Sequence, residues 1–194
     1  MKYTFAITAL IVATVVFTTP VSADKTTTSG IYLTAEDFAN GTITSAGFDN
    51  SASHKIELHN SIFGKPYIEV THGTDKQKYP KSEIYGFRLG DGRSFRFVGN
   101  DEYEIREAGP LYIYRTERLV RKGATEPAYY FSVGAAGEVL PLTMLNLKKG
   151  FPENHRFHDA LDETFRSDSD LMWFDDFHKM YKVNRVFVAS QTIR

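Results

Sequence analysis

The chain has no cysteine among its 194 residues. This absence excludes a disulfide framework, a thiolate nucleophile and a metal site built on thiolates. The stability of the folded protein must therefore come from its apolar core. That core is predicted to be aromatic, because the chain carries 15 phenylalanines and 11 tyrosines.

The chain also lacks an excess of either charge. It has 23 Lys and Arg residues against 24 Asp and Glu residues, and its formal net charge is −1 at pH 7. Nucleic acids and anionic membrane surfaces attract proteins that carry basic patches or basic tails. We therefore expect neither of them to be the main partner.

Long apolar runs are missing except at the N-terminus. Lys2 precedes the uncharged, mostly apolar stretch Tyr3–Phe17, and Val21 and Ala23 form the small-x-small pattern that signal peptidases cut. A membrane-spanning helix needs about 20 consecutive apolar residues, and this run is shorter and interrupted by threonines. Residues 1–23 are therefore predicted to be a cleaved signal peptide. We expect a secreted protein, periplasmic or extracellular, with no stable membrane anchor after cleavage.

The rest of the sequence contains no linker rich in proline, glycine or serine that would divide it. Residues 24–29 include three consecutive threonines and little apolar surface, so they are predicted to be a flexible exit segment. Residues 30–194 are predicted to form a single globular domain, because their number lies within the usual range of domain sizes.

Alternation of apolar and polar residues predicts strands through the middle of the chain. The clearest signal is the pair of segments Tyr85–Leu89 and Ser94–Val98, which flank a turn containing Asp91 and Gly92. An Asp-Gly turn between two alternating segments marks a β-hairpin. Further strands are predicted at Tyr103–Arg106, Leu111–Leu119, Tyr129–Val133 and Glu138–Leu142. Such closely spaced hairpins predict a mainly antiparallel sheet.

After Pro141 the apolar residues recur with a helical period. Phe157, Leu161 and Phe165 are spaced four residues apart and predict one helix with an apolar stripe. A second helix is predicted to begin within Ser167–Ser169 and to bury Leu171, Phe174, Phe177, Met180 and Tyr181. The predicted fold class is therefore α+β, with an antiparallel, strongly twisted or half-barrel sheet followed by C-terminal helices.

Four segments carry a resemblance to known proteins. They are Gly30–Phe38, the Ile84–Phe87 strand that leads into the Asp91-Gly92 hairpin, Gly109–Tyr114, and the stretch from Asn146 to Pro152. Together they resemble a group of small, uncharacterised secreted proteins of Bacteroidetes-type bacteria. The resemblance extends over nearly the whole mature length and implies a bacterial, secreted origin. It carries over no active-site residue.

Two histidines and a carboxylate recur on one face of the first predicted C-terminal helix. His155, His158 and Asp162 stand at i, i+3 and i+7, so they could converge on Zn²⁺ with one coordination position open. A metal-dependent hydrolase is therefore one hypothesis, although the histidine spacing of zinc proteases is missing. The alternative is an exposed helix face opposite the apolar stripe. Further along, Asp175 and His178 are predicted to form an intrahelical ion pair.

Carboxylates and serines give little indication of catalysis. Asp101, Glu102, Glu104 and Glu107 lie near one strand, and only their separation in space decides whether two of them form a glycosidase-type pair. The sequence contains no Gly-x-Ser-x-Gly nucleophile motif and no phosphate-binding loop.

Tyrosines alternate with aliphatic residues in the predicted strand Leu111–Leu119. Tyr112 and Tyr114 project from the face opposite Leu111 and Ile113, where their rings can stack on a sugar or a peptide. The structural alternative is that they pack under a covering helix. The leading hypothesis is a non-catalytic binding or envelope-associated module without a cofactor. Its expected partner is a glycan, a peptide or an envelope component.

Overall fold

The computed structural model describes residues 28–48, 54–58 and 64–191. The predicted signal peptide and residues 24–27 of the predicted exit segment lie outside these described residues. Thr28 and Ser29, the last two residues of that segment, pair as part of a strand and are not a flexible exit. Among the helices within them, none is long and apolar enough to cross a membrane.

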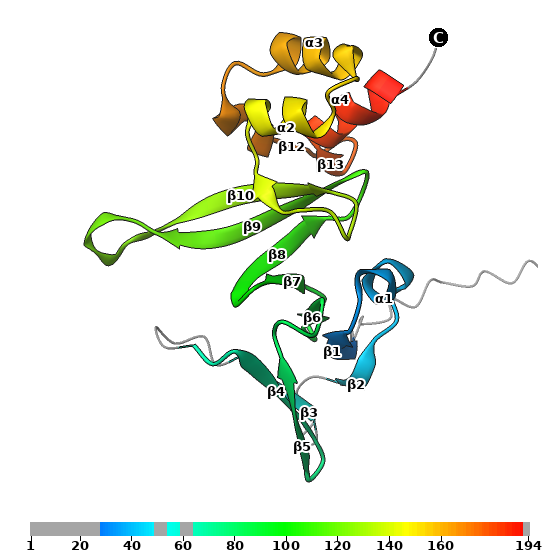
Figure 1. The fold of residues 1–194 in the computed structure, drawn as a ribbon, viewed down its shortest axis with the longest axis vertical. Coiled ribbons are helices and arrows are strands. Elements are labelled where there is room, and N and C mark those ends of the chain that lie inside the picture. The colour runs from blue at the N-terminus through cyan, green and yellow to red at the C-terminus, as the bar shows by residue number, and fades with distance from the viewer. Residues whose placement is uncertain (1–27, 49–53, 59–63, 192–194) are drawn as a thin grey trace, which may run out of the picture.

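An eight-stranded antiparallel sheet forms the body of the protein and confirms the predicted α+β class. Its strands follow the order β11-β10-β9-β8-β7-β6-β1-β2. Their bounds are Thr28–Tyr32 (β1), Thr44–Phe48 (β2), Gly86–Arg88 (β6), Ser94–Val98 (β7), Asp101–Glu107 (β8), Leu111–Leu119 (β9), Thr125–Val133 (β10) and Leu140–Pro141 (β11). Figure 1 shows that the sheet is strongly twisted and that β9 and β10 extend beyond their neighbours as a two-stranded arm. A short 3₁₀ turn, Arg121–Gly123, joins these two strands.

The predicted Asp91-Gly92 hairpin joins β6 to β7. Gly92 has a φ of 90°, which glycine adopts without strain, and the Asp91 carboxylate accepts a hydrogen bond from the Arg93 N–H at 2.9 Å. Gly86 on β6 is required for a different reason. A Cβ atom there would lie 1.9 Å from the carbonyl oxygen of Phe95, so only glycine allows the two strands to approach this closely.

Helices follow the sheet, as predicted. The C-terminal elements are Met144–Gly150 (α2), His155–Thr164 (α3), a 3₁₀ turn at Asp168–Met172, Phe174–Asp175 (β12), Met180–Tyr181 (β13) and Lys182–Gln191 (α4). The predicted apolar stripe lies on α3, where Phe157 and Leu161 are fully buried. Asn154 caps this helix by accepting a hydrogen bond from the Phe157 N–H at 3.0 Å.

The second predicted C-terminal helix is wrong. Its place is taken by the 3₁₀ turn and the small hairpin β12–β13, and the final helix begins only at Lys182. The Asp175 carboxylate accepts hydrogen bonds from the N–H groups of Phe177 and His178, at 3.1 Å each. Lys179 takes a left-handed conformation with a φ of 55°. These local bonds compete with helix formation and leave the Phe177 side chain 89% exposed.

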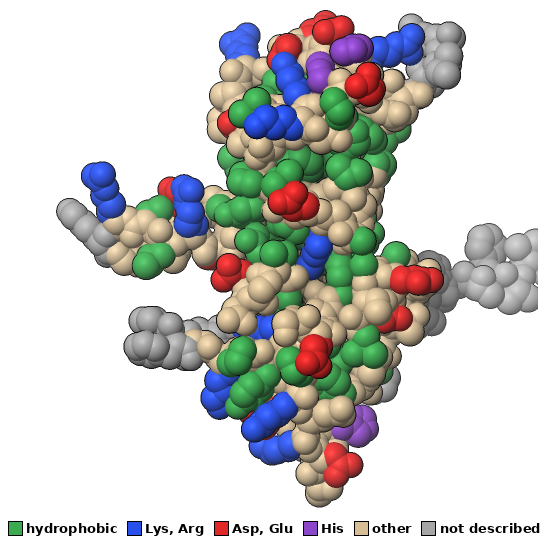
Figure 2. Space-filling model, in the orientation of Figure 1, with side chains coloured by type: hydrophobic (Ala, Val, Ile, Leu, Met, Phe, Trp, Pro, Cys, Tyr) green, Lys and Arg blue, Asp and Glu red, His purple; other side chains and the backbone are tan. Residues whose placement is uncertain are grey.

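The helices pack against β9 and β10 and enclose the first apolar core, which we call the helical core. Leu111, Ile113 and Phe131 of the sheet contribute to it, and the helical segments add Phe157, Leu161, Leu171, Val183 and Phe187. Figure 2 shows hydrophobic side chains gathered between the helical end and the sheet. Full burial of one such side chain stabilises the fold by about 1.5–3 kcal/mol.

A three-stranded sheet covers the other end of the large sheet and encloses a second core, the strand core. Its strands are His54–Glu57 (β3), Tyr67–His72 (β4) and Asp75–Pro80 (β5), in that order. The core members from β4 are Ile68 and Val70, and those from the large sheet are Ile31, Phe87 and Phe97.

The pairing register places both cores on one face of the large sheet. Phe87 pairs with Phe95, and Phe95 pairs with Glu104. Glu104 in turn pairs with Arg115, which shares its face with Ile113 two residues earlier. A charged strip that includes Glu104 and Arg115 therefore separates the two cores.

Candidate functional site

The charged strip forms the floor of a groove of about 870 Å³, which we call the central groove. Four cationic side chains line it, namely Lys65, Lys81, Arg93 and Arg115. Four carboxylates line it as well, namely Asp101, Glu102, Glu104 and Glu117. The two charge signs are therefore balanced within the groove.

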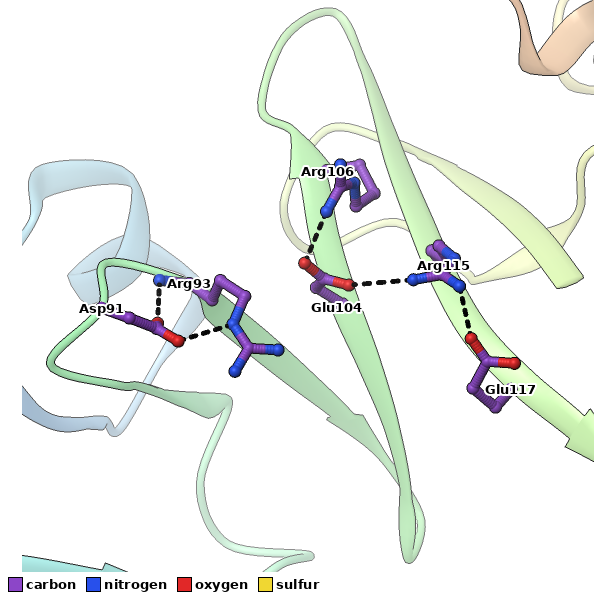
Figure 3. A network of polar contacts seen from close by, with 6 residues as sticks. All are labelled: Asp91, Arg93, Glu104, Arg106, Arg115 and Glu117. Atoms are coloured by element: carbon purple, nitrogen blue, oxygen red, sulfur yellow. Dashed lines mark hydrogen bonds and ion pairs between the residues drawn. The ribbon is translucent and has the colours of Figure 1, made fainter. Parts of the chain in front are cut away.

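Glu104 is the centre of the polar network in the groove (Figure 3). Its side chain is largely buried, yet the carboxylate accepts a hydrogen bond from Arg106 at 2.7 Å and lies 4.0 Å from an Arg115 nitrogen. Arg115 reaches in the other direction to the Glu117 carboxylate. A buried carboxylate is costly unless it is paired, and these arginines supply the pairing. The two arginines also fix the orientation of the Glu104 carboxylate.

A second ion pair lies at the border between the groove and the strand core. The Lys81 side chain is 4% exposed, and its ammonium group lies 3.1 Å from the Glu102 carboxylate. The ammonium group also lies 5.2 Å from the centre of the Phe97 ring. The pair is desolvated by the aromatic core beneath it, so its geometry is more constrained than that of a surface pair.

Arg93 forms the wall of the groove on the side of the β6–β7 hairpin. Its Nε donates a hydrogen bond to Asp91 at 2.8 Å, and its guanidinium carbon lies 5.6 Å from the centre of the Phe95 ring. A neighbouring hollow of about 510 Å³ shares Arg93 and Glu104 with the groove. The polar surface therefore continues past Arg93 toward the loop that follows β8.

The structure does not gather the predicted zinc ligands. The His158 ring nitrogen Nε2 lies 2.9 Å from the Phe151 carbonyl oxygen and 3.1 Å from that of Lys148, while Asp162 binds the Lys148 ammonium group at 2.6 Å. His155 is exposed, with its ring centre 5.9 Å from that of His158. Across residues 28–48, 54–58 and 64–191, no group of three His, Cys, Asp or Glu side chains could hold a metal ion. The end of α2 therefore binds His158 and Asp162, two of the three predicted ligands.

The structure buries the two tyrosines of the predicted stacking surface. Tyr112 and Tyr114 lie on the face opposite Leu111 and Ile113, as predicted, but they are 9% and 0% exposed. Phe38 on the short helix Ala35–Asn40 (α1) packs against Tyr112 with ring centres 5.9 Å apart. The rings therefore belong to the interior of the protein, which is the structural alternative stated above.

Asp175 and His178 do form the predicted ion pair, at 2.9 Å, although within the β12–β13 hairpin rather than a helix. Arg185 on α4 lies 2.8 Å from the same carboxylate. Hydrogen bonds from the backbone and side chain of His178 lower the pKa of Asp175 below its ordinary value. The pair closes a turn and lies outside the central groove.

The four carboxylates noted near one strand separate in the structure. Asp101, Glu102 and Glu104 line the central groove, whereas Glu107 accepts hydrogen bonds from Asn184 and from the Tyr181 N–H. The arginines of the groove were not predicted from the sequence. Their one sequence signal is the alternation of charged residues with apolar ones along β8 and β9. This alternation indicates that one face of the sheet is charged, but it does not say which strands pair with each other.

Comparison of the chain with protein-family models, with curated proteins and with solved structures found no match.

Proposed function

We propose that this protein is a secreted, non-catalytic binding module whose central groove holds a neutral, polyhydroxylated ligand, namely a glycan chain. The observation that carries the proposal is the balance of charge in the groove, where four cationic and four anionic side chains line one open polar surface. The predicted signal peptide supports it, because a secreted protein meets the glycans of the cell envelope and its surroundings.

The ion pairs of the groove favour a neutral ligand over a charged one. Glu104 is paired with Arg106 and Arg115, and Glu102 with Lys81. A charged ligand group would have to compete with one of these pairs. A sugar hydroxyl both donates and accepts, so it can use the remaining N–H groups of an arginine and the remaining lone pairs of a carboxylate without breaking the pair.

The position of the groove favours a glycan over a peptide. Peptides recognised in extended form usually add a strand to an exposed sheet edge. The central groove instead crosses the face of the sheet over β7, β8 and β9, which are interior strands. Its floor is polar, apart from the partly buried Phe95 ring.

The same ion pairs argue for binding rather than hydrolysis. A glycosidase requires one carboxyl group that donates a proton and a second that acts as base or nucleophile. In the groove, Glu102 and Glu104 each accept hydrogen bonds from a cationic side chain. They are therefore arranged as hydrogen-bond acceptors with fixed orientation.

Calorimetric titration of the mature protein with hexasaccharides tests the proposal. The probes are linear hexamers of β-1,4-glucose, α-1,4-glucose and β-1,4-N-acetylglucosamine, together with an acidic hexamer of galacturonate. At least one neutral hexamer is expected to bind more tightly than the acidic one. Arg115→Met removes the donors at the centre of the groove and is expected to weaken that binding about tenfold.

Arg118→Met is the matched control, because Arg118 lies further along β9 and pairs with Glu126 outside the groove. It is expected to bind like the wild type. Tighter binding of the acidic hexamer, or an equal loss of affinity in both variants, would contradict the proposal.

A further inference from the structure

The face of the large sheet opposite the groove carries two arginines that form no ion pair with any carboxylate of the described residues. They are Arg88 on β6 and Arg96 on β7. In the strand register Arg96 lies opposite Gly86, and Arg88 lies opposite Ser94. Arg88 and Arg96 are therefore diagonal neighbours on one face of the sheet. Both side chains are partly buried.

Neutral hydroxyl groups hold the Arg96 guanidinium in place. Its Nη1 donates to the Tyr114 hydroxyl at 3.1 Å and lies 3.5 Å from the Ser132 hydroxyl. The Tyr114 and Ser132 hydroxyls are also 2.8 Å apart, and the Tyr85 ring centre lies 5.3 Å from the guanidinium carbon. These contacts fix the orientation of the cation but do not neutralise its charge.

Two buried donors of this region have no hydrogen-bond partner among the described residues. They are the Tyr85 hydroxyl and the Arg88 Nε. The Tyr85 side chain is only 9% exposed, and its burial raises the pKa of the phenol, which keeps the hydroxyl protonated. Buried polar groups in native proteins are nearly always paired, so two unpaired donors at one cluster of cations need an explanation.

We propose that Arg88, Arg96 and the Tyr85 hydroxyl form a binding site for an oxyanionic group, a phosphate, sulfate or carboxylate. The guanidinium groups and the hydroxyl are donors, and an arginine fork matches the paired oxygens of such an anion. The anion would accept hydrogen bonds from the donors that now lack a partner. This site lies on the other face from the central groove, so it stands independently of the proposed glycan binding.

Titration of the full mature protein, followed by the NMR signals of the arginine Nε–H groups, tests this site. Inorganic phosphate, sulfate and acetate are added separately at constant ionic strength. Saturable shifts of the Arg88 and Arg96 signals are expected with at least one anion. Tighter binding of phosphate or sulfate assigns the ligand to the tetrahedral class, and tighter binding of acetate assigns it to the carboxylates.

Three variants separate a binding site from a structural cluster. Arg88→Gln and Arg96→Gln are each expected to weaken binding about tenfold, whereas Arg118→Gln carries the same charge change at a distant position and is expected to bind normally. Tyr85→Phe removes only the phenolic hydroxyl and keeps the buried ring. It is expected to keep the fold and to weaken anion binding several-fold, a result that a purely structural tyrosine would not give.

Two results would overturn the proposal. One is the absence of saturable shifts at Arg88 and Arg96 with all three anions. The other is an equal loss of affinity in Arg118→Gln, which would mean that the anions respond only to net charge. If Arg96→Gln fails to fold, Arg88→Gln and Tyr85→Phe still decide the matter, because Arg88 is only partly buried and Tyr85→Phe preserves the packing of the ring.

Discussion

The Asn184 side chain on α4 bonds both backbone groups of Leu111 at the start of β9. Its Oδ1 accepts a hydrogen bond from the Leu111 N–H at 3.0 Å, and its Nδ2 donates to the Leu111 carbonyl at 2.7 Å. The same Nδ2 donates to the Glu107 carboxylate at 2.7 Å. Asn184 thus substitutes for a neighbouring strand and fixes the last helix against the sheet across a long sequence separation.

Replacement of Asn184 by leucine is expected to lower the free energy of unfolding by about 2–4 kcal/mol, because buried backbone groups of Leu111 lose their partners. Urea unfolding monitored by circular dichroism measures the change. Asn146→Ala removes a single, exposed bond to the Pro141 carbonyl and serves as control. An equal effect of both substitutions would show that Asn184 does not carry the contact between α4 and the sheet.

The Lys81–Glu102 pair is expected to respond asymmetrically to substitution. Glu102→Gln leaves the buried Lys81 ammonium group without its carboxylate and is expected to cost about 3 kcal/mol of stability. Lys81→Met removes the buried charge and fills a similar volume, so it is expected to cost less. Glu126→Gln in the exposed pair with Arg118 is the control and is expected to have little effect. A larger cost for Lys81→Met would refute this account of the pair.

The β12–β13 hairpin is expected to open in acid. The pKa of Asp175 is lowered in the folded protein by hydrogen bonds from His178, so the unfolded form binds more protons between the two pKa values. Its contribution to stability is therefore present above pH 3.8, the ordinary pKa, and is lost as the pH falls through the folded pKa. Trp173, the only tryptophan, precedes β12, and its fluorescence reports the opening.

Asp175→Asn is expected to alter the Trp173 signal already at neutral pH and to remove its acid transition. Asp176→Asn is the matched control, since the Asp176 side chain is 91% exposed. An acid transition that persists unchanged in Asp175→Asn would assign it to another group.

Substitution in one core is expected to affect that core more than the other. Leu161→Ala in the helical core is expected to cost about 2–5 kcal/mol, because a fully buried side chain is lost and a cavity remains. Hydrogen exchange should show lost protection first in the strands and helices of that core. Ile68→Ala in the strand core is the reciprocal variant. Equal loss of protection in both cores from either substitution would show a single cooperative unit.

The features that the sequence predicted correctly depend on neighbouring residues. The Asp91-Gly92 turn and the Phe157–Leu161 stripe are local patterns, and both appear in the structure. The helix predicted after Ser167 does not form, because the side chain of Asp175 accepts hydrogen bonds from nearby N–H groups. The spacing of apolar residues does not reveal such local side-chain bonds.

The candidate sites depended on contacts between distant segments, which periodicity does not give. The zinc prediction placed His155, His158 and Asp162 on one helix face, but Lys148 at the end of α2 reaches Asp162. The central groove arises because Glu104 pairs with Arg115 across two strands, and a register shift of one residue would have turned both side chains to the other face.

The two cores divide the chain at one point. Every buried member of the strand core lies between Ile31 and Phe97, and every buried member of the helical core lies between Leu111 and Phe187. A chain exported with its N-terminus first therefore delivers all the buried residues of the strand core before any of those of the helical core. Until β9 is present, β8 is an unpaired edge strand of the large sheet. For a chain exported as proposed above, the order of emergence is expected to match the order of assembly, and the central groove is completed only when β9 joins β8.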